Sequence, residues 1–145
     1  MKAVIQIVNN ANLTVDNKLI SEIGYGYVIY LGVKKGDTKE NADYFIKKIT
    51  ALRIFEDENG KMNLSLREVN GSILSISQFT LYANTNDGNR PSFVNALNPI
   101  LAKELYLKFN DELRTYGYVV EEGIFGAHMD IELLNSGPCT IIYEF

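Results

Sequence analysis

A chain of 145 residues, of which 46% are hydrophobic, can close one core, so we expect a single domain over residues 1–145. One cysteine and one histidine exclude an internal disulfide and leave too few ligands for a zinc site, and a net charge of −4 disfavours general affinity for nucleic acids. No apolar run is long enough to span a membrane, and "MKAVIQIVNN" alternates where a signal peptide would be continuous. We therefore expect a cytoplasmic protein with no membrane partner.

The first part of the chain predicts strands. Residues 2–8 alternate apolar and polar side chains, as a half-buried strand does. Residues 13–16 and 19–20 flank a turn at Asp16-Asn17-Lys18, which predicts a hairpin. Residues 25–33 are rich in β-branched and aromatic residues, and Gly32 among them indicates a bulge or a close backbone approach.

A helix is expected next. Asp37 can cap it, and Glu40 stands at the spacing of the reciprocal partner in a capping box. Its apolar residues recur at helical spacing, so one face should be buried: Ala42, Phe45, Ile46, Ile49 and Leu52. A polar turn centred on Asn59-Gly60 follows.

The second half predicts another helix among strands. Residues 73–78 form a strand and residues 84–91 a loop. Asn98 caps the second helix, Pro99 occupies its first position, and Gly117 ends it. The buried face of this helix should be Ala102, Leu105, Phe109, Leu113 and Tyr116. Further strands are expected at residues 118–121, 129–134 and 140–145. Strands broken by two separated helices, with connections too short for many parallel crossovers, predict an α+β domain with a mainly antiparallel sheet.

Elimination narrows the chemistry. A Ser-His-Asp or Cys-His site needs an imidazole, and the sole histidine, His128, is more often an ordinary surface residue. Cys139 is more often a small buried apolar residue than a nucleophile. Phosphate-loop and dinucleotide motifs do not occur, and paired acids such as Glu121-Glu122 are interpreted as solvated charges. We therefore predict no metal and no cofactor.

Two polar segments stand out among the strands. "SQFTLYA" places Ser77, Gln78 and Thr80 in a β-rich run, and "NSGPCT" puts a Gly-Pro step between two expected strands. Periodicity favours a half-buried strand for the first and a plain turn for the second. A Gly-Pro peptide bond is also one at which the cis isomer is accessible. From the residues alone, both structural and functional interpretations remain open.

Taken together, these segments resemble the D-aminoacyl-tRNA deacylase family. The matching stretches run in order along essentially the whole chain: "MKAVIQ", "LGVKKGDT", "KITALRIFEDENGKMNLSL", "SQFTLYA", "NRPSF", "GIFGAHM" and "LNSGPCT". The two signatures of the family are "SQFTL" and "NSGPCT", and finding both in one chain is specific.

The resemblance implies the fold of that family and a homodimer with cross-subunit active sites. In each subunit a cis Gly137-Pro138 step would enter the neighbouring pocket beside residues 77–80, with Ala127 and Met129 also binding substrate. Main-chain carbonyls there would leave the side chain of a D-aminoacyl group pointing to solvent, whereas an L side chain would collide. Glycine has no side chain to exclude, so mischarged glycyl-tRNA(Ala) is expected to be cleared too.

The implied reaction is hydrolysis of the ester between a D-amino acid and the 3′-terminal adenosine of tRNA. Backbone N–H groups near Phe79 and Thr80 are expected to stabilise the oxyanion, in the segment that begins at Ser77. Gln78 and Thr80 would position the substrate, while the 2′-hydroxyl of the adenosine helps to activate water. A nucleophilic Thr80 is the less favoured alternative, because it lacks an obvious base.

Two positions depart from the family. Ile7 stands where members usually carry an Arg that is thought to hold the Gly-Pro element, so an aminoacyl-tRNA deacylase of relaxed chirality is the alternative. Before "NRPSF", Asn86 and Asp87 replace the usual Lys or Arg. Weak contact with tRNA should therefore rely on cationic residues elsewhere, although each of them is more often a solvated surface charge: Lys34, Lys35 and Arg90.

Two further classes of function stay open. One is a tRNA- or peptide-binding module without catalysis. The other is a hydrolase of free D-aminoacyl esters or amides, which the acidic charge favours because RNA plays no part in it. DNA is not an expected partner of any of these.

Overall fold

A mixed β-sheet forms the centre of the structure, a computed structural model that describes residues 1–86 and 88–145. Its strands run in the order β2-β1-β3-β6-β7, with β8 also paired to β1. The strands of this sheet are β1 (Lys2–Val15), β2 (Lys18–Ile23), β3 (Gly26–Gly32), β6 (Ser72–Ser77), β7 (Val120–Glu122) and β8 (Asp130–Glu144), while β4 (Phe55–Glu56) and β5 (Met62–Leu64) form a separate hairpin. Asp87, and with it part of the predicted loop at residues 84–91, lies outside the described residues.

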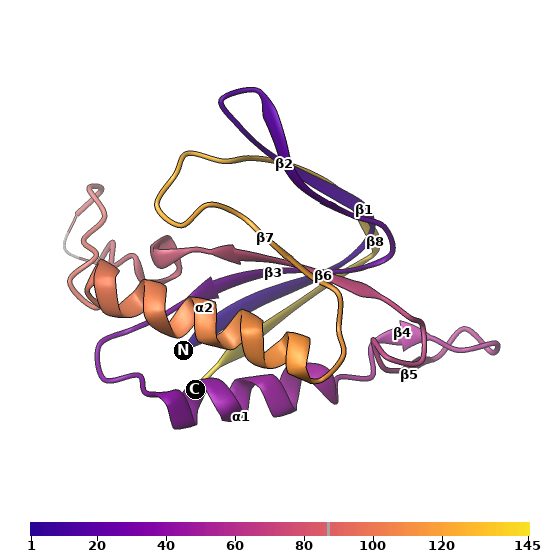
Figure 1. The fold of residues 1–145 in the computed structure, drawn as a ribbon. Helices are drawn as coiled ribbons and strands as arrows, with labels where there is room; N and C mark the ends of the chain where they lie inside the picture. Colours follow the sequence, from indigo (N-terminus) through magenta and orange to yellow (C-terminus); the bar gives the residue numbers. More distant parts are fainter. Residues whose placement is uncertain (87) are drawn as a thin grey trace.

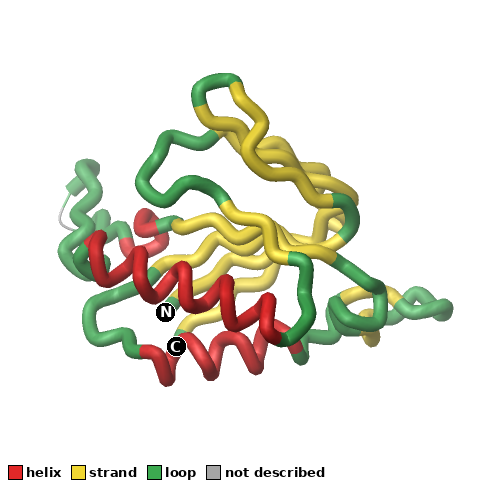
Figure 2. Tube along the Cα trace, viewed as in Figure 1, coloured by secondary structure: helices red, strands yellow, loops and turns green. Residues whose placement is uncertain are grey.

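Two helices cover one face of this sheet. These are α1 (Lys39–Thr50) and α2 (Pro99–Thr115), which lie side by side beneath the strands in Figure 1 and are drawn red in Figure 2. Between the sheet and the helices lies the larger core, which contains Phe45 and Ile49 of α1 and Tyr106 and Phe109 of α2. Within residues 1–86 and 88–145, no helix is both long and apolar enough to cross a membrane.

A second, smaller core lies on the opposite face of the sheet. There the β1–β2 hairpin and the first half of β8 curl over β3 and β6 (Figure 1). The buried residues of this core are Val8, Ala11, Leu13, Ile23, Val28, Leu74 and Ile76. Burial on both faces explains why β3 and β6 have nearly continuous apolar sequences.

The pairing of the strands confirms the α+β class and refines the sheet. Strand β1 is antiparallel to β2, β3 and β8, but β6 is parallel to both β3 and β7. The predicted mainly antiparallel sheet is confirmed, and connections long enough for a parallel crossover occur at these two places only among the described residues. There α1 and α2 lie in the connections and make them long enough for a crossover.

Two long strands replace four shorter predicted ones. Strand β1 is continuous where strands at residues 2–8 and 13–16 were expected, and β8 is continuous where a turn between residues 129–134 and 140–145 was expected. The first half of β1 pairs with the second half of β8, the second half of β1 pairs with the first half of β8, and register shifts absorb the extra residues. Gly137-Pro138 therefore lies within one strand, at an irregularity of its pairing, and the plain-turn interpretation is wrong.

The helix ends follow the sequence at α2 but not at α1. Asn98 Oδ1 accepts the Ile100 N–H at 2.9 Å, and Gly117 follows the helix with a φ of 85°, as predicted. Tyr116, expected on the buried face, is 41% exposed because it lies just beyond the last helical residue.

At α1 the expected capping pair of Asp37 and Glu40 is wrong. The helix is capped by Thr38, whose N–H donates to Asn41 Oδ1 at 2.8 Å. The Asp37 carboxylate instead accepts from the Met1 amino group at 2.8 Å and from the Lys34 N–H at 2.7 Å.

Candidate functional site

The "SQFTLYA" segment turns away from the sheet at Ser77. Strand β6 ends there, and residues Phe79–Tyr82 form a short 3-10 helix, η1, so the interpretation as a continued strand is wrong. The Gln78 N–H donates to the Leu31 carbonyl at 2.8 Å, which ties the turn to the end of β3. A Cβ added to Gly32 would lie 3.1 Å from the Gln78 carbonyl oxygen. The close backbone approach predicted at Gly32 is confirmed.

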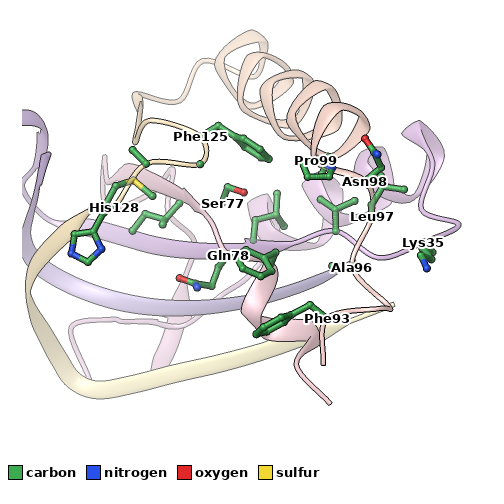
Figure 3. Close-up of a pocket in the computed structure, with 18 of the residues that line it drawn as sticks. Lys35, Ser77, Gln78, Phe93, Ala96, Leu97, Asn98, Pro99, Phe125 and His128 are labelled. Carbon is green, nitrogen blue, oxygen red and sulfur yellow. The ribbon is translucent and has the colours of Figure 1, made fainter. Parts of the chain in front are cut away.

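A cavity of about 730 Å³ opens beside this turn. Ser77, Gln78 and Phe79 line it from one side. Residues 123–129 contribute Phe125, Ala127 and Met129, and Figure 3 shows Phe125 and Gln78 on opposite sides of the space. Most of the remaining lining is aliphatic or aromatic and includes Leu31, Val33, Phe93, Leu97 and Ile131. The structure thus brings together five of the eight residues predicted to act in catalysis or substrate binding.

Two polar side chains of the turn contact each other, and only one of them lines the cavity. Gln78 Nε2 donates to Thr80 Oγ1, so the two side chains predicted to position substrate contact each other. Thr80 itself is exposed and does not occur among the described residues that line the cavity. Phe79 is 54% exposed and packs edge-on against Phe93, with ring centroids 4.9 Å apart.

The carbonyl of Ser75 joins the two sides of the cavity. It accepts the Tyr106 hydroxyl at 2.8 Å and the Gly123 N–H at 3.3 Å. Burial raises the pKa of Tyr106, which keeps its hydroxyl a neutral donor, and its ring centroid lies 5.9 Å from that of Phe125. Ser75 lies in strand β6, two residues before Ser77 at its end, and Gly123 begins the segment that carries Phe125. Tyr106 of α2 therefore holds both sides in place.

Gly137 and Pro138 lie in a different part of the chain. Their peptide bond is cis, the isomer that the resemblance implies, and both residues are exposed. Neither Gly137 nor Pro138 is among the described residues that line the cavity. Cys139, directly after them, is only 5% exposed, and burial raises the pKa of its thiol, which agrees with a small buried residue and not a reactive one.

The predicted cationic contacts do not form one patch. Lys35 lines the cavity, at the far right of Figure 3. Lys34 Nζ instead donates to the Phe145 carbonyl at 2.9 Å, and Arg90 is an exposed loop residue. His128, at the left of Figure 3, is 93% exposed and lies 3.6 Å from an Asp130 carboxylate oxygen, as expected of a surface histidine.

Some residues that line the cavity are not among the site residues predicted from the sequence, although two of them lie in stretches that match the family. Phe93, Leu97 and Phe125 line the cavity from loops, and local periodicity does not distinguish such residues from ordinary core residues. Within residues 1–86 and 88–145, no group of three or more His, Cys, Asp or Glu side chains is placed to hold a metal ion.

Comparisons with known proteins point to one family. The model of the family described as D-Tyr-tRNA(Tyr) deacylase matches residues 4–144. A D-aminoacyl-tRNA deacylase of Limosilactobacillus reuteri is 54% identical over 144 residues, 99% of each chain. One from Fusobacterium nucleatum is 51% identical over 99% of this chain and 95% of its own.

Two solved structures share the fold. A structure titled c-Myc DNA Unwinding Element Binding Protein superposes with a TM-score of 0.94 at 39% identity, covering 100% of this chain and 99% of that one. A probable eukaryotic D-amino acid tRNA deacylase has a TM-score of 0.82 over 98% of this chain and 97% of its own, and its 18% identity shows the fold alone.

Proposed function

Because the chain belongs to the D-Tyr-tRNA(Tyr) deacylase family, we propose that it hydrolyses the ester bond of D-aminoacyl-tRNA in the cytoplasm and releases free tRNA and the D-amino acid. The observation that carries this proposal is that Ser77, Gln78 and Phe79 line one cavity together with Ala127 and Met129. The backbone N–H groups of the turn suit the ester, and the mostly apolar lining of the cavity suits the nucleoside attached to it.

The 3′-terminal adenosine is the part of the substrate that suits the apolar walls. A nucleobase stacks on aromatic side chains whatever its sequence context, and Phe93 and Phe125 both line the cavity. The volume of about 730 Å³ leaves room for a nucleoside as well as an amino-acid backbone. Lys35 at the cavity supplies a cation for the adjoining phosphate, in a chain that is otherwise acidic.

The chemistry needs a positioned water and a stabilised oxyanion. Water attacks the ester carbonyl carbon, negative charge develops on the carbonyl oxygen, and the ribose 3′-oxygen leaves with a proton. The first N–H groups of any helix have no acceptor within it, so those of Phe79 and Thr80 at the start of η1 suit the developing charge. The 2′-hydroxyl of the adenosine assists the water, while Gln78 and Thr80 position the substrate.

Chiral selection requires a second copy of the chain. Gly137 and Pro138 are exposed and do not occur among the described residues lining their own cavity. In a two-fold symmetric homodimer, each pair enters the neighbouring cavity and its carbonyls crowd the α-carbon of the aminoacyl group. An L side chain then collides, a D side chain leaves toward solvent, and glycyl-tRNA(Ala) is cleared as well.

A deacylase of relaxed chirality is the second candidate, and Ile7 favours it. Ile7 is 5% exposed and packs in the larger core, between the sheet and the helices. Its side chain is aliphatic and does not supply the charged contact that an Arg would. Hydrolysis rates of D-tyrosyl-, L-tyrosyl- and glycyl-tRNA decide between the two. A rate on the L substrate close to that on the D substrate would establish the relaxed enzyme.

The RNA-assisted mechanism is tested with a modified substrate. Replacing the terminal adenosine by 2′-deoxyadenosine should abolish turnover of D-tyrosyl-tRNA, whereas Thr80→Ala and Thr80→Ser should retain much of it. Normal cleavage of the deoxy substrate would refute the role of the 2′-hydroxyl. Binding of D-tyrosyl-tRNA without release of tyrosine would show a binding module, and an equal rate on a free D-tyrosine ester would show that RNA is irrelevant.

A further inference from the structure

The pairing of β8 with β1 is irregular at residues 135–139, which we call the β8 bulge. Asn135 pairs with Val8 and Thr140 pairs with Gln6, so the four residues between them on β8 (136 to 139) face the single residue Ile7 on β1. The surplus chain has to leave the plane of the sheet. It carries Gly137 and Pro138 out to the surface, where both are exposed.

One side chain closes the base of the β8 bulge. Asn135 Nδ2 donates to the Ile7 carbonyl at 2.9 Å and to the Cys139 carbonyl at 3.1 Å. A carboxamide nitrogen carries two protons, so one group can satisfy both acceptors at once. Regular ladder pairing stops here, and a partly buried carbonyl needs a donor from elsewhere. Asn135 thus joins the first residue of the bulge to its last residue and to β1.

The anchoring points of this closure are themselves fixed. Ile7 and Cys139 are each 5% exposed and belong to the larger core, between the sheet and the helices. Gly137, at the tip, has a φ of 114°, and a Cβ there would lie 3.0 Å from the Cys139 nitrogen. The bulge is therefore tight at the tip and closed at the base by the two Asn135 bonds.

We infer that Asn135 is the positioning residue for Gly137 and Pro138 and thereby sets the discrimination between D and L substrates. The inference rests on the proposed function, in which these two residues enter the partner's cavity. Ile7 takes part through its main-chain carbonyl, which any side chain at that position would leave in place. The aliphatic replacement of the usual Arg therefore does not remove this closure.

The first test needs no substrate. Cys139 is the sole cysteine and follows the bulge tip, so its rate of reaction with a thiol reagent reports opening of the base. Asn135→Ala should raise this rate about tenfold, because two hydrogen bonds are lost. Asn12→Ala is the matched control: Asn12 Nδ2 also bridges β1 to β8, at 3.1 Å from Glu132 Oε2, but far from the bulge, and its loss should leave the rate unchanged.

The second test measures hydrolysis of D- and L-tyrosyl-tRNA. Asn135→Ala should lower the ratio of the two rates about tenfold, while Asn135→Ser, whose hydroxyl donates one bond and not two, should give an intermediate ratio. Asn12→Ala should keep the wild-type ratio. Thermal unfolding of each variant shows that the compared proteins are folded.

Two outcomes would overturn the inference, and a third would overturn the proposed function on which it rests. An Asn135→Ala thiol rate equal to that of the control means that the side chain does not hold the bulge. A raised thiol rate with an unchanged D-to-L ratio means that its role is structural only. A wild-type chain that cleaves neither substrate overturns the proposed function itself. The thiol measurement needs no substrate, so it still shows whether Asn135 closes the base of the bulge.

Discussion

The turn after β6 and the bulge in β8 carry the two polar segments of the chain, and they are built in opposite ways. The turn at residues 77–82 packs onto its own subunit. The Gln78 N–H forms a hydrogen bond with the end of β3, and the absence of a side chain at Gly32 lets the Gln78 backbone approach closely. The bulge at residues 135–139 has an anchored base but an exposed tip. The first therefore shapes a cavity within the chain, whereas the second presents main-chain atoms to something outside it.

The largest effect is expected at the exposed tip. Gly137→Ala forces an L residue to a φ of 114° and brings a Cβ to 3.0 Å from the Cys139 nitrogen, so the tip must move. Because the tip crowds the α-carbon of the aminoacyl group, its movement misplaces a bound D-aminoacyl ester as well. A misplacement of about 1 Å can cost about 100-fold in rate, and we expect a loss of that size in hydrolysis of D-tyrosyl-tRNA.

Gly60→Ala provides the matched control for this substitution. Gly60 also has a positive φ, 70°, but an added Cβ there meets nothing within 4 Å. Both variants strain the backbone, by about 1–3 kcal/mol, and both should unfold at lower temperature. If Gly60→Ala lost as much activity as Gly137→Ala, the tip would have no special role.

An intermediate effect is expected beneath the cavity. Tyr106→Phe removes the hydroxyl that holds the Ser75 carbonyl between the two sides of the cavity, at a stability cost of about 1 kcal/mol. We expect kcat/KM for D-tyrosyl-tRNA to fall about tenfold, since each 1.4 kcal/mol of lost transition-state binding is a factor of ten. Steady-state kinetics measure this directly.

The control for that variant is Tyr27→Phe. Tyr27 is equally buried, but its hydroxyl donates to the Leu52 carbonyl at a long 3.5 Å, away from the cavity lining. Its kinetics should match the wild type. Equal losses in the two variants would mean that general stability, and not the geometry of the two cavity sides, limits the reaction.

The smallest effect is expected for the cation at the cavity. Lys35→Ala should weaken binding of tRNA a few-fold and reduce the slope of log affinity against log salt by about one. Lys103→Ala, on the exposed surface of α2, should change neither. Measurements of tRNA binding at several salt concentrations provide the comparison, and an unchanged slope for Lys35→Ala would remove this residue from the RNA contact.

The sequence predicted the elements better than their connections. Asn98, Pro99 and Gly117 mark the two ends of α2 through the conformation and hydrogen bonds of the neighbouring backbone. Both ends of this helix are therefore predicted almost to the residue. Asp37 failed as a cap because its carboxylate is occupied by the Met1 amino group, 36 positions away in the chain. Local patterns do not contain such competition.

The candidate site divides in the same way. Ser77, Gln78 and Phe79 were identified through the resemblance, and they line the cavity. Phe93 and Phe125 were missed because tertiary packing alone brings these loop residues to the same space. A Gly-Pro step has the same sequence pattern in a turn and in a bulge, and only the pairing of β8 with β1 distinguishes the two.

Complementation between subunits tests the central claim most directly. Gly137→Ala damages the projecting tip and leaves the cavity intact, whereas Ala127→Trp fills the cavity and leaves the tip intact. Each variant alone should be nearly inactive on D-tyrosyl-tRNA. If the tip completes the neighbouring cavity, a coexpressed mixture should regain roughly a quarter of wild-type activity, because half of the dimers are mixed and each of these has one intact site. Activity no greater than the sum of the two separate variants would contradict the claim.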